Sequence, residues 1–246
     1  MRTHLVYLLI TNIILYCTSC TSTKEISYFQ NGKDTTFSIV MDTIEAPIQK
    51  NDILNITVSS LNPTASADFN LKYAPEKGYL VNNDGNVVMP VLGNVKAAGL
   101  TKSQLKKDIT KNILDKQLLL DPLVEIRHLN YEVTVLGEVS HPSVITVPSE
   151  QISLVKALGL AGDMTIYGKR TNVLLIREEN GKRTTTHIDL TSSEFLQSPY
   201  YYLKPNDLIY VEPSKSKVET ASRSLILLPI LLSTVSLLLI AYATFK

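Results

Sequence analysis

The sequence at residues 78–93 is GYLVNNDGNVVMPVLG, in which two apolar runs flank the tetrapeptide NNDG. Asn, Asp and Gly tolerate positive φ angles, so this tetrapeptide predicts the turn of a β-hairpin. Upstream of it, Leu54, Ile56 and Val58 alternate with polar residues, as in a strand with one buried face. This part of the chain is therefore expected to form a small sheet.

A helix is predicted soon after the hairpin. Thr101 is placed to cap its first turn, and Gln104 follows three residues later, which is the spacing of a capping box. Asp121 and Pro122 are expected to end the helix, and residues 123–127 have the composition of a strand. The apolar stripe of the helix consists of Leu105, Ile109, Ile113, Leu114 and Leu118.

A second set of strands and one more helix is predicted from about residue 130. Residues 131–137 alternate apolar and polar side chains, and an apolar run returns after a turn. Ser153 is placed to cap a short helix, and Gly162 to end it in the left-handed conformation. A hairpin, one helix and then more strands is a β-grasp-like order. The strands expected besides the first are residues 144–147, 173–177, 183–190, 200–203 and 208–211.

The two sets of elements share a short echo. Asn51-Asp52 and Asn206-Asp207 each precede an apolar strand. Each pair combines a residue that accepts positive φ with an Asp able to bond the turn amides. The echo indicates either two related units or two ordinary turns.

Composition excludes several classes of protein. The chain has 246 residues, with 24 Lys and Arg against 23 Asp and Glu, so a nucleic-acid partner is not expected. Its only cysteines are Cys17 and Cys20, which exclude a disulfide scaffold and a four-cysteine zinc site.

The N-terminus has the layout of a secretory signal peptide. Arg2 precedes a largely apolar run at residues 5–16, and small residues then lead to Cys20. Small side chains just before a cysteine are typical of a lipoprotein signal, so we expect cleavage before Cys20 and acylation of its thiol. Cys17 is a poor candidate because the bulky Tyr16 precedes it. An ordinary signal peptide or an uncleaved anchor is the alternative.

The C-terminus predicts a second anchor. Residues 225–245 carry no charge, and a helix of that length reaches about 31 Å, close to the thickness of a hydrocarbon core. One side of this helix is rich in Leu and the other in small and hydroxyl side chains. It is expected to be a plain single-span anchor or a helix that packs against others. The fold class expected for the whole chain is α+β, two small mixed domains with a C-terminal transmembrane helix.

No catalytic or metal site is apparent. His128, His141 and His187 lack the spacing of metal ligands. Residues 162–169 differ from a phosphate-binding loop in spacing and in the residue that follows. No enzyme activity and no cofactor are therefore expected. The carboxylates considered as glycosidase acids, without any sign that two of them pair, are Asp68, Asp84, Glu138 and Asp163.

Taken in order, these motifs resemble those of a known family. Residues 78–93 with the helix opening at Thr101 resemble the polysaccharide export domain of outer-membrane capsule-export lipoproteins. Residues 133–139, the helix ending at Gly162 and residues 202–211 resemble the soluble-ligand-binding β-grasp module that follows that domain. Cys20 matches the acylated cysteine of the family. The chain differs in having Asn51 and Asn206 where the family usually has Gly, and in having one β-grasp module where longer members have two.

The resemblance implies an outer-membrane channel for capsular or extracellular polysaccharide. Copies of the chain would form a ring whose soluble domains lie in the periplasm. The lipid at Cys20 and the C-terminal helix would tie the ring to the outer membrane, and an inner-membrane copolymerase, often a tyrosine kinase, would dock on it. The expected divisions are a signal peptide (1–19), a lipidated tether (20–46), the export domain (47–129), the β-grasp domain (130–214), a linker (215–224) and the transmembrane helix (225–245).

Two other functions stay open at this stage. One is a single-span accessory protein whose β-grasp domain binds glycan or an export partner without forming a pore. The other is a periplasmic enzyme that processes glycan. A stable ring in detergent would favour the channel, a monomer would favour the accessory protein, and shortening of polymer by the purified protein would favour the enzyme.

Overall fold

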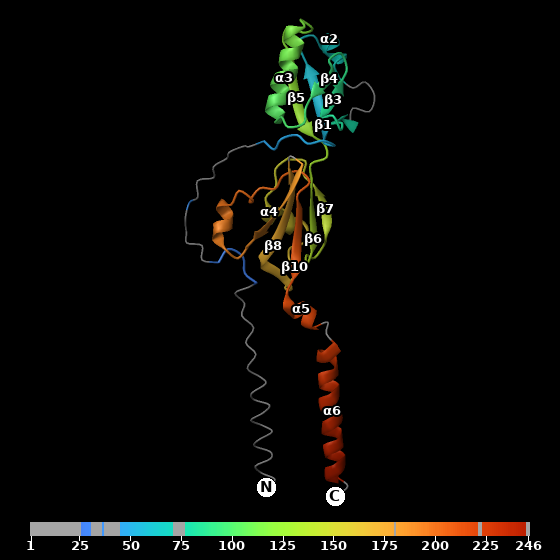
Figure 1. The fold of residues 1–246 in the computed structure, drawn as a ribbon, viewed down its shortest axis with the longest axis vertical. Helices are drawn as coiled ribbons and strands as arrows, with labels where there is room; N and C mark the ends of the chain where they lie inside the picture. Colours follow the sequence, from blue (N-terminus) through green and yellow to red (C-terminus); the bar gives the residue numbers. More distant parts are fainter. Residues whose placement is uncertain are drawn as a thin grey trace.

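The computed structural model describes residues 26–30, 36, 45–70, 77–179, 181–220 and 223–244. Two hydrophobic cores, formed by separate parts of the chain, lie one above the other along the long axis of the molecule (Figure 1). Both contain strands and helices, which confirms the α+β class. The predicted signal peptide and Cys20 lie outside the described residues.

The first domain is built on a three-stranded antiparallel sheet. Its central strand β1 (Ile53–Ser59) lies between β2 (Tyr79–Leu80) and β5 (Leu123–His128). The predicted alternation is confirmed, since Leu54, Ile56 and Val58 are buried on one face of β1.

The predicted hairpin is displaced by one turn. Gly85 adopts a φ of 80° and its N–H donates to the Asn82 carbonyl at 2.8 Å, so NNDG does form a turn. That turn leads from β2 into β3 (Asn86–Met89), but β3 pairs with β4 (Gly93–Lys96). The connection between β3 and β4 passes through Val91 at a φ of 66°, an unusual conformation for a β-branched residue.

Helix α3 (Lys102–Asp115) covers the sheet of the first domain (Figure 1). The capping box of Thr101 and Gln104 is present, and Leu105, Ile109 and Ile113 are fully buried. The rest of the predicted stripe was wrong, because Leu114 is 45% exposed and Leu118 is 38% exposed. The helix stops at Asp115, six residues before the expected end. A short helix that was not predicted, α2 (Pro63–Ala67), follows β1 and is capped by Asn62.

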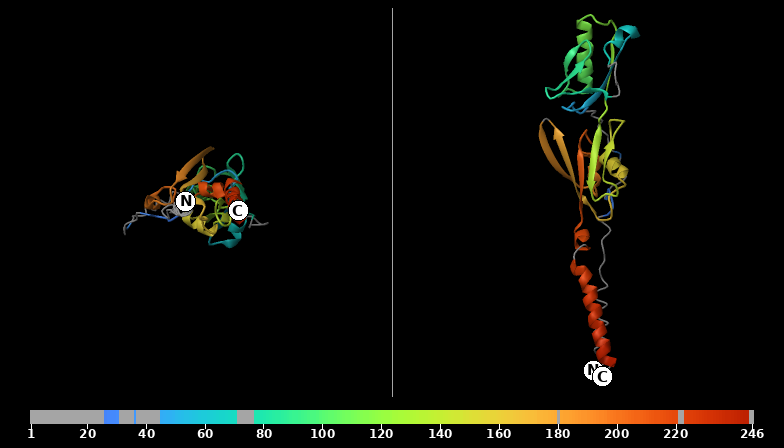
Figure 2. Two further views of the ribbon diagram at one scale, coloured as in Figure 1. Left: turned by 90° about the horizontal axis from the view of Figure 1, so that it is seen from below. Right: turned by 90° about the vertical axis from the view of Figure 1, so that its right-hand side faces the viewer.

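The second domain is a five-stranded mixed sheet with one helix. The strand order is β7-β6-β10-β8-β9, and β10 runs parallel to β6 and antiparallel to β8. Helix α4 (Leu154–Leu160) is capped by Ser153 as predicted, and Gly162 follows at a φ of 77°. Figure 2 shows α4 on one side of the sheet. The strands are β6 (Glu132–Gly137), β7 (Ser143–Thr146), β8 (Gly168–Glu179), β9 (Lys182–Ile188) and β10 (Leu208–Pro213).

One predicted strand of the second domain does not form. Residues 200–203 make only an isolated bridge between Tyr202 and Ser153. The 3-10 helix η3 (Ser193–Gln197) precedes them, and Phe195 and Leu203 pack into the core from this irregular segment. Of residues 200–203 only Leu203 is buried, and Tyr202 is 37% exposed, so the apolar composition here predicted neither a strand nor uniform burial.

The N-terminal segment is docked on the second domain. The Phe29 N–H donates to the Leu190 carbonyl at 3.1 Å, and Gln30 forms a parallel bridge with Ser192. The Tyr28 hydroxyl donates to Asp163 at 2.5 Å, and the Arg170 guanidinium lies 5.1 Å from the centre of the Tyr28 ring. Burial and the neighbouring Asp163 carboxylate raise the pKa of Tyr28 above its usual range.

Two helices extend the chain beyond the second domain, on the side away from the first (Figures 1 and 2). They are α5 (Lys215–Thr220) and α6 (Arg223–Thr244). The C-terminal helix is thus confirmed as a helix. Among the residues that the structure describes, however, no helix is both long enough and apolar enough to cross a bilayer, so the predicted span at residues 225–245 is not supported.

Candidate functional site at the joint between the domains

The first sequence echo forms a closed turn at the lower edge of the first domain. Asn51 has a φ of 71°, and Asp52 then leads into β1. The Asp52 carboxylate accepts a hydrogen bond from the Gln49 backbone N–H at 2.7 Å. Asp52 is 2% exposed, so its carboxylate is buried behind the turn.

The second echo forms the same turn at the facing edge of the second domain. Asn206 has a φ of 66°, and Asp207 leads into β10. The Asp207 carboxylate accepts from the Lys204 backbone N–H, also at 2.7 Å, and Asp207 is fully buried. The two segments therefore share one local geometry, in which the Asn supplies the positive φ and the Asp bonds the turn amide.

Asp207 is paired with a cation from the neighbouring strand. Its two oxygens accept from Nε and Nη2 of Arg177 at 2.9 and 2.7 Å, a bidentate geometry. The guanidinium of Arg177 also lies 5.8 Å from the centre of the Tyr200 ring. Burial alone would lower the pKa of Arg177, but the hydrogen bonds and charge of Asp207 raise it above its ordinary value.

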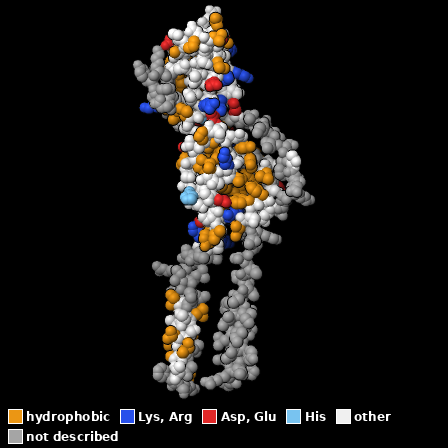
Figure 3. Space-filling model, turned by 180° about the vertical axis from the view of Figure 1, so that it is seen from behind, with side chains coloured by type: hydrophobic (Ala, Val, Ile, Leu, Met, Phe, Trp, Pro, Cys, Tyr) orange, Lys and Arg blue, Asp and Glu red, His pale blue; other side chains and the backbone are white. Residues whose placement is uncertain are grey.

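Asp52 belongs to a chain of ionisable side chains that crosses the joint. Its Oδ2 lies 3.3 Å from Nε2 of His128, whose Nδ1 lies 3.5 Å from Oε2 of Glu150 in the second domain. Glu150 in turn pairs with Lys102, at the start of α3 in the first domain. Acidic and basic side chains lie together at this level of the molecule in Figure 3. These contacts connect the two domains through buried or half-buried groups.

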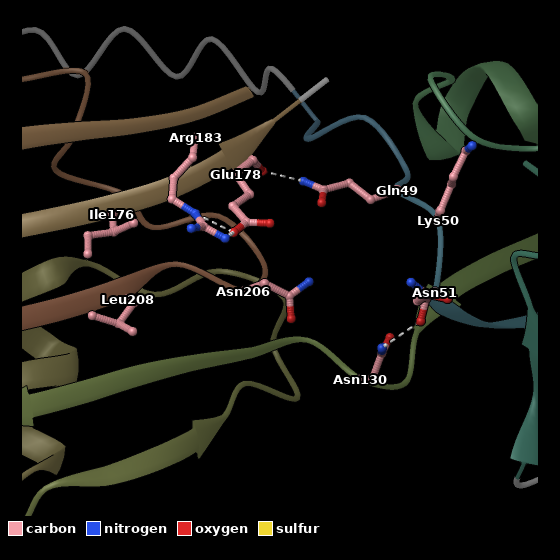
Figure 4. A pocket seen from close by; sticks show the side chains of 9 residues that line it. All are labelled: Gln49, Lys50, Asn51, Asn130, Ile176, Glu178, Arg183, Asn206 and Leu208. Carbon is pink, nitrogen blue, oxygen red and sulfur yellow. Dashed lines mark hydrogen bonds and ion pairs between the residues drawn. The ribbon is translucent and has the colours of Figure 1, made fainter. Parts of the chain in front are cut away.

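A cleft of about 550 Å³ lies between the two turns (Figure 4). Its walls come from both domains, and the segment that joins them contributes one residue, Asn130. Most of its lining residues carry polar groups, namely four carboxamides, two cations and one carboxylate. The lining residues are Gln49, Lys50, Asn51, Asn130, Ile176, Glu178, Arg183, Asn206 and Leu208.

Hydrogen bonds hold the walls of the cleft in place. Asn130 accepts from the Ile53 N–H at 2.8 Å and donates to the Asn51 carbonyl at 3.2 Å, so it fixes the first turn from below. Gln49 donates through Nε2 to the Glu178 carbonyl at 3.0 Å, which connects the two domains directly. The cleft is therefore a defined surface with donors and acceptors on both sides.

The histidines considered as metal ligands lie apart from one another. His128 is in the joint, His141 follows β6 and bonds through its backbone to Ala161, and His187 lies on β9 opposite Leu174. Within the described ranges, no group of three or more His, Cys, Asp or Glu side chains is arranged to hold a metal ion.

The acids considered as a catalytic pair also lie in separate places. Asp163 accepts from Tyr28, and Glu138 accepts from Thr165 at 2.7 Å and from Lys217 on α5. The hydrogen bonds from Lys217 and Thr165 hold the pKa of Glu138 below its ordinary value. The remaining two are Asp68, which follows α2, and Asp84, which lies in the exposed NNDG turn.

The sequence predicted the two turns, but it did not predict that they face each other across one cleft. Residues 51, 130 and 206 are far apart in the chain, and the polar character of Asn130 gave no sign that it would bridge a turn. His128 and Glu150 were likewise unremarkable as single residues. Cys20, the predicted lipidation site, lies outside the described residues.

Comparison with known proteins shows that the first domain is similar to a known family. Residues 42–129 match the family described as polysaccharide biosynthesis/export protein. The chain is 30% identical over 139 residues to the EPS I polysaccharide export outer membrane protein EpsA of Ralstonia nicotianae, and 29% identical over 146 residues to the protein of that name from Ralstonia solanacearum. These alignments cover 55% and 57% of this chain and 35% and 38% of the relatives, so the match spans little more than a third of their length.

The matched region coincides with the first domain, from just before the Asn51 turn to Leu129 in the joint. It contains the displaced hairpin and the capped helix α3, the features on which the resemblance of the first domain to the export domain was based. The similarity to the polysaccharide biosynthesis/export family is therefore a property of the first domain, at residues 42–129.

Proposed function

We propose that this protein is a subunit of an oligomeric outer-membrane channel that exports capsular or extracellular polysaccharide. The observation that carries the proposal is the match of the first domain to the export family, together with relatives named as outer-membrane export proteins. In this proposal the second domain is the β-grasp module that binds ligand. The protein acts by positioning and guiding a polymer, and it needs no cofactor.

Self-association is supported by helix α6. Its described side chains include several large apolar groups that are more than half exposed in the single chain. Such a surface requires cover, and identical helices from a closed ring of copies would provide it. The exposed apolar residues are Ile230, Leu232, Val235, Leu237, Leu238, Ile240 and Tyr242.

The docked N-terminal segment supports a membrane anchor at the same end of the molecule as α6. Tyr28 is held by Asp163, shortly after the end of α4, and Glu138 nearby is paired with Lys217 of α5. In Figure 1 the blue segment around residue 28 lies beside the lower part of the second domain. A lipid on Cys20, eight residues before Tyr28, would therefore be tethered to the second domain through this docked segment.

The opposite end of the molecule is the proposed docking site for an inner-membrane copolymerase or tyrosine kinase. The end of the first domain remote from α6 exposes Leu61 and Leu120 almost completely, at 91% and 95%. The two lie close together, because the Leu61 N–H donates to Asp121 at 2.9 Å. Two leucines exposed side by side are suited to contact with another protein.

Deleting the gene tests the proposal. We expect surface polysaccharide to disappear while glycan persists inside the cell or in the periplasm, and re-expression of the chain to restore export. The measurement is surface staining with glycan assays of separated compartments. Outer-membrane fractionation and native mass in detergent should give a ring, whereas unchanged surface glycan in the deletion strain would reject the function.

Replacing Cys20 by alanine tests the lipid anchor. Because only the Cys20 thiol is expected to carry the acyl group, the variant should lose all incorporation of a clickable palmitate analogue and part of its retention in the outer membrane. Cys17→Ala is the matched control and should keep full labelling. Labelling that survives in Cys20→Ala would refute the assignment.

A further inference from the structure

The two turn asparagines have side chains that the fold does not use. Among the residues that the structure describes, neither the Asn51 nor the Asn206 carboxamide has a hydrogen-bond partner. An Asn in a turn commonly bonds nearby backbone with its side chain, but here Asp52 and Asp207 perform that role. Both carboxamides line the same cleft, as Figure 4 shows.

The turns themselves require only a positive φ. Glycine reaches this conformation without strain, so an asparagine at φ angles of 71° and 66° is not the least costly choice for the backbone. Both asparagines are exposed in the cleft, and neither carboxamide bonds the turn within the described part of the chain. Their shared position on facing walls points to a ligand in the cleft.

The lining defines the chemistry of that ligand. A carboxamide offers donors and an acceptor on one plane, which suits neighbouring hydroxyl groups that also do both. Lys50 adds an ammonium group without an ion-pair partner in the described part of the chain. The half-buried Ile176 and Leu208 provide an apolar floor for the C–H face of a sugar ring. The cleft volume lies within the range of about 300–1,000 Å³ that holds small ligands.

The same lining argues against a protein partner at this position. Protein interfaces are anchored by aromatic and Arg side chains in a dry centre, whereas lysine is depleted there. Among the described residues, the lining includes no aromatic side chain, and Arg183 is already paired with Glu178 at 2.6 Å. Without a ring to stack on, a sugar would be held weakly, which suits a polymer that must move on.

We propose that the cleft between the two domains is a contact site for the exported glycan, in which Asn51, Asn206 and Lys50 bind its hydroxyl and acidic groups. This inference rests on the proposed export function and names the residues that touch the substrate. It requires that the two domains act together, since each supplies one of the asparagines. Binding is expected to be weak and rapidly reversible.

The test uses the full chain in detergent and oligosaccharides made by partial hydrolysis of the producing strain's own extracellular polysaccharide. Asn51→Gly and Asn206→Gly remove the carboxamides while keeping a residue that accepts positive φ, so both variants should fold with unchanged melting temperature. Each should weaken binding about fivefold, the loss of one neutral hydrogen bond, and the double variant about 25-fold. Asn83→Gly, in the exposed NNDG turn, is the matched control and should bind like the parent chain.

The possible results distinguish a failure of the proposed glycan site from a failure of the proposed export function. Unchanged binding by the double variant, or no binding by the parent chain, overturns the glycan site, whereas the gene deletion decides export independently. A double variant that loses its ring but keeps its affinity would show that the cleft is a contact between subunits, which also overturns the inference. Loss of affinity with an intact ring supports it.

Discussion

Replacing Asp207 by alanine is expected to lower the free energy of unfolding of the second domain by about 3–5 kcal/mol. Asp207 is fully buried and bonds both Arg177 and the Lys204 backbone N–H. Its removal leaves the guanidinium of Arg177, which is 8% exposed, without its bidentate partner, and the turn loses its closing bond. Chemical denaturation of the full chain, followed at the transition of the second domain, measures the loss.

Two further variants make that result specific. Asp84→Ala, in the exposed NNDG turn, should change stability by less than about 0.5 kcal/mol. Arg177→Leu combined with Asp207→Ala should lose less than Asp207→Ala alone, because no unpaired charge stays buried. If Asp207→Ala and Asp84→Ala had equal effects, the pair would contribute nothing to the fold.

Replacing Gly137 by alanine is expected to cost about 3 kcal/mol or more through combined strain and steric overlap. Gly137 ends β6 at a φ of 92°, and a Cβ atom there would lie 2.1 Å from the Val211 carbonyl oxygen. That carbonyl accepts from the Glu138 N–H at 2.9 Å across the parallel pair of β6 and β10. The strands would have to separate at the centre of the sheet, and the melting temperature of the second domain should fall.

Gly93→Ala is the matched control for this prediction. Gly93 also has a positive φ, of 74°, but a Cβ atom there would meet nothing within 4 Å. Its replacement should cost only the backbone strain of about 1–2 kcal/mol. The difference between the two variants isolates the effect of the close approach to β10, and equal losses would show that this approach is unimportant.

Local signals predicted the elements that local chemistry decides. The capping box at Thr101, the cap at Ser153 and the alternation in β1 each depend on residues within a few positions, and each is present. The same applies to the positive φ of Gly162 and of the two turn asparagines. At the helix starts, a residue without a side-chain acceptor would leave a backbone N–H unbonded. At the positive-φ positions, most other side chains would clash with their own backbone.

Pairing between strands was harder to predict. The NNDG turn forms, yet β2 pairs with β1, because Tyr79 and Val81 are buried in the core of the first domain. The hairpin forms later, between β3 and β4, and its turn contains Val91 at a positive φ that the backbone preference of valine does not predict. Residues 200–203 have the apolar composition of a strand but do not form one. An apolar pattern specifies which side chains are buried, but the partner that covers them depends on the rest of the chain.

The α+β class, the two mixed domains, the helix caps and the twin turns could be predicted from the amino-acid sequence, because each depends on short-range backbone preferences or on side-chain hydrophobicity. It also indicated the family, through motifs that keep their order along the chain. No sequence pattern predicted that Asn51 and Asn206 line one cleft, that Asn130 bonds the first turn, or that His128 lies between carboxylates of two domains. These contacts join residues separated by 22 to 155 positions, and local backbone preferences cannot bring such residues together before both cores have formed.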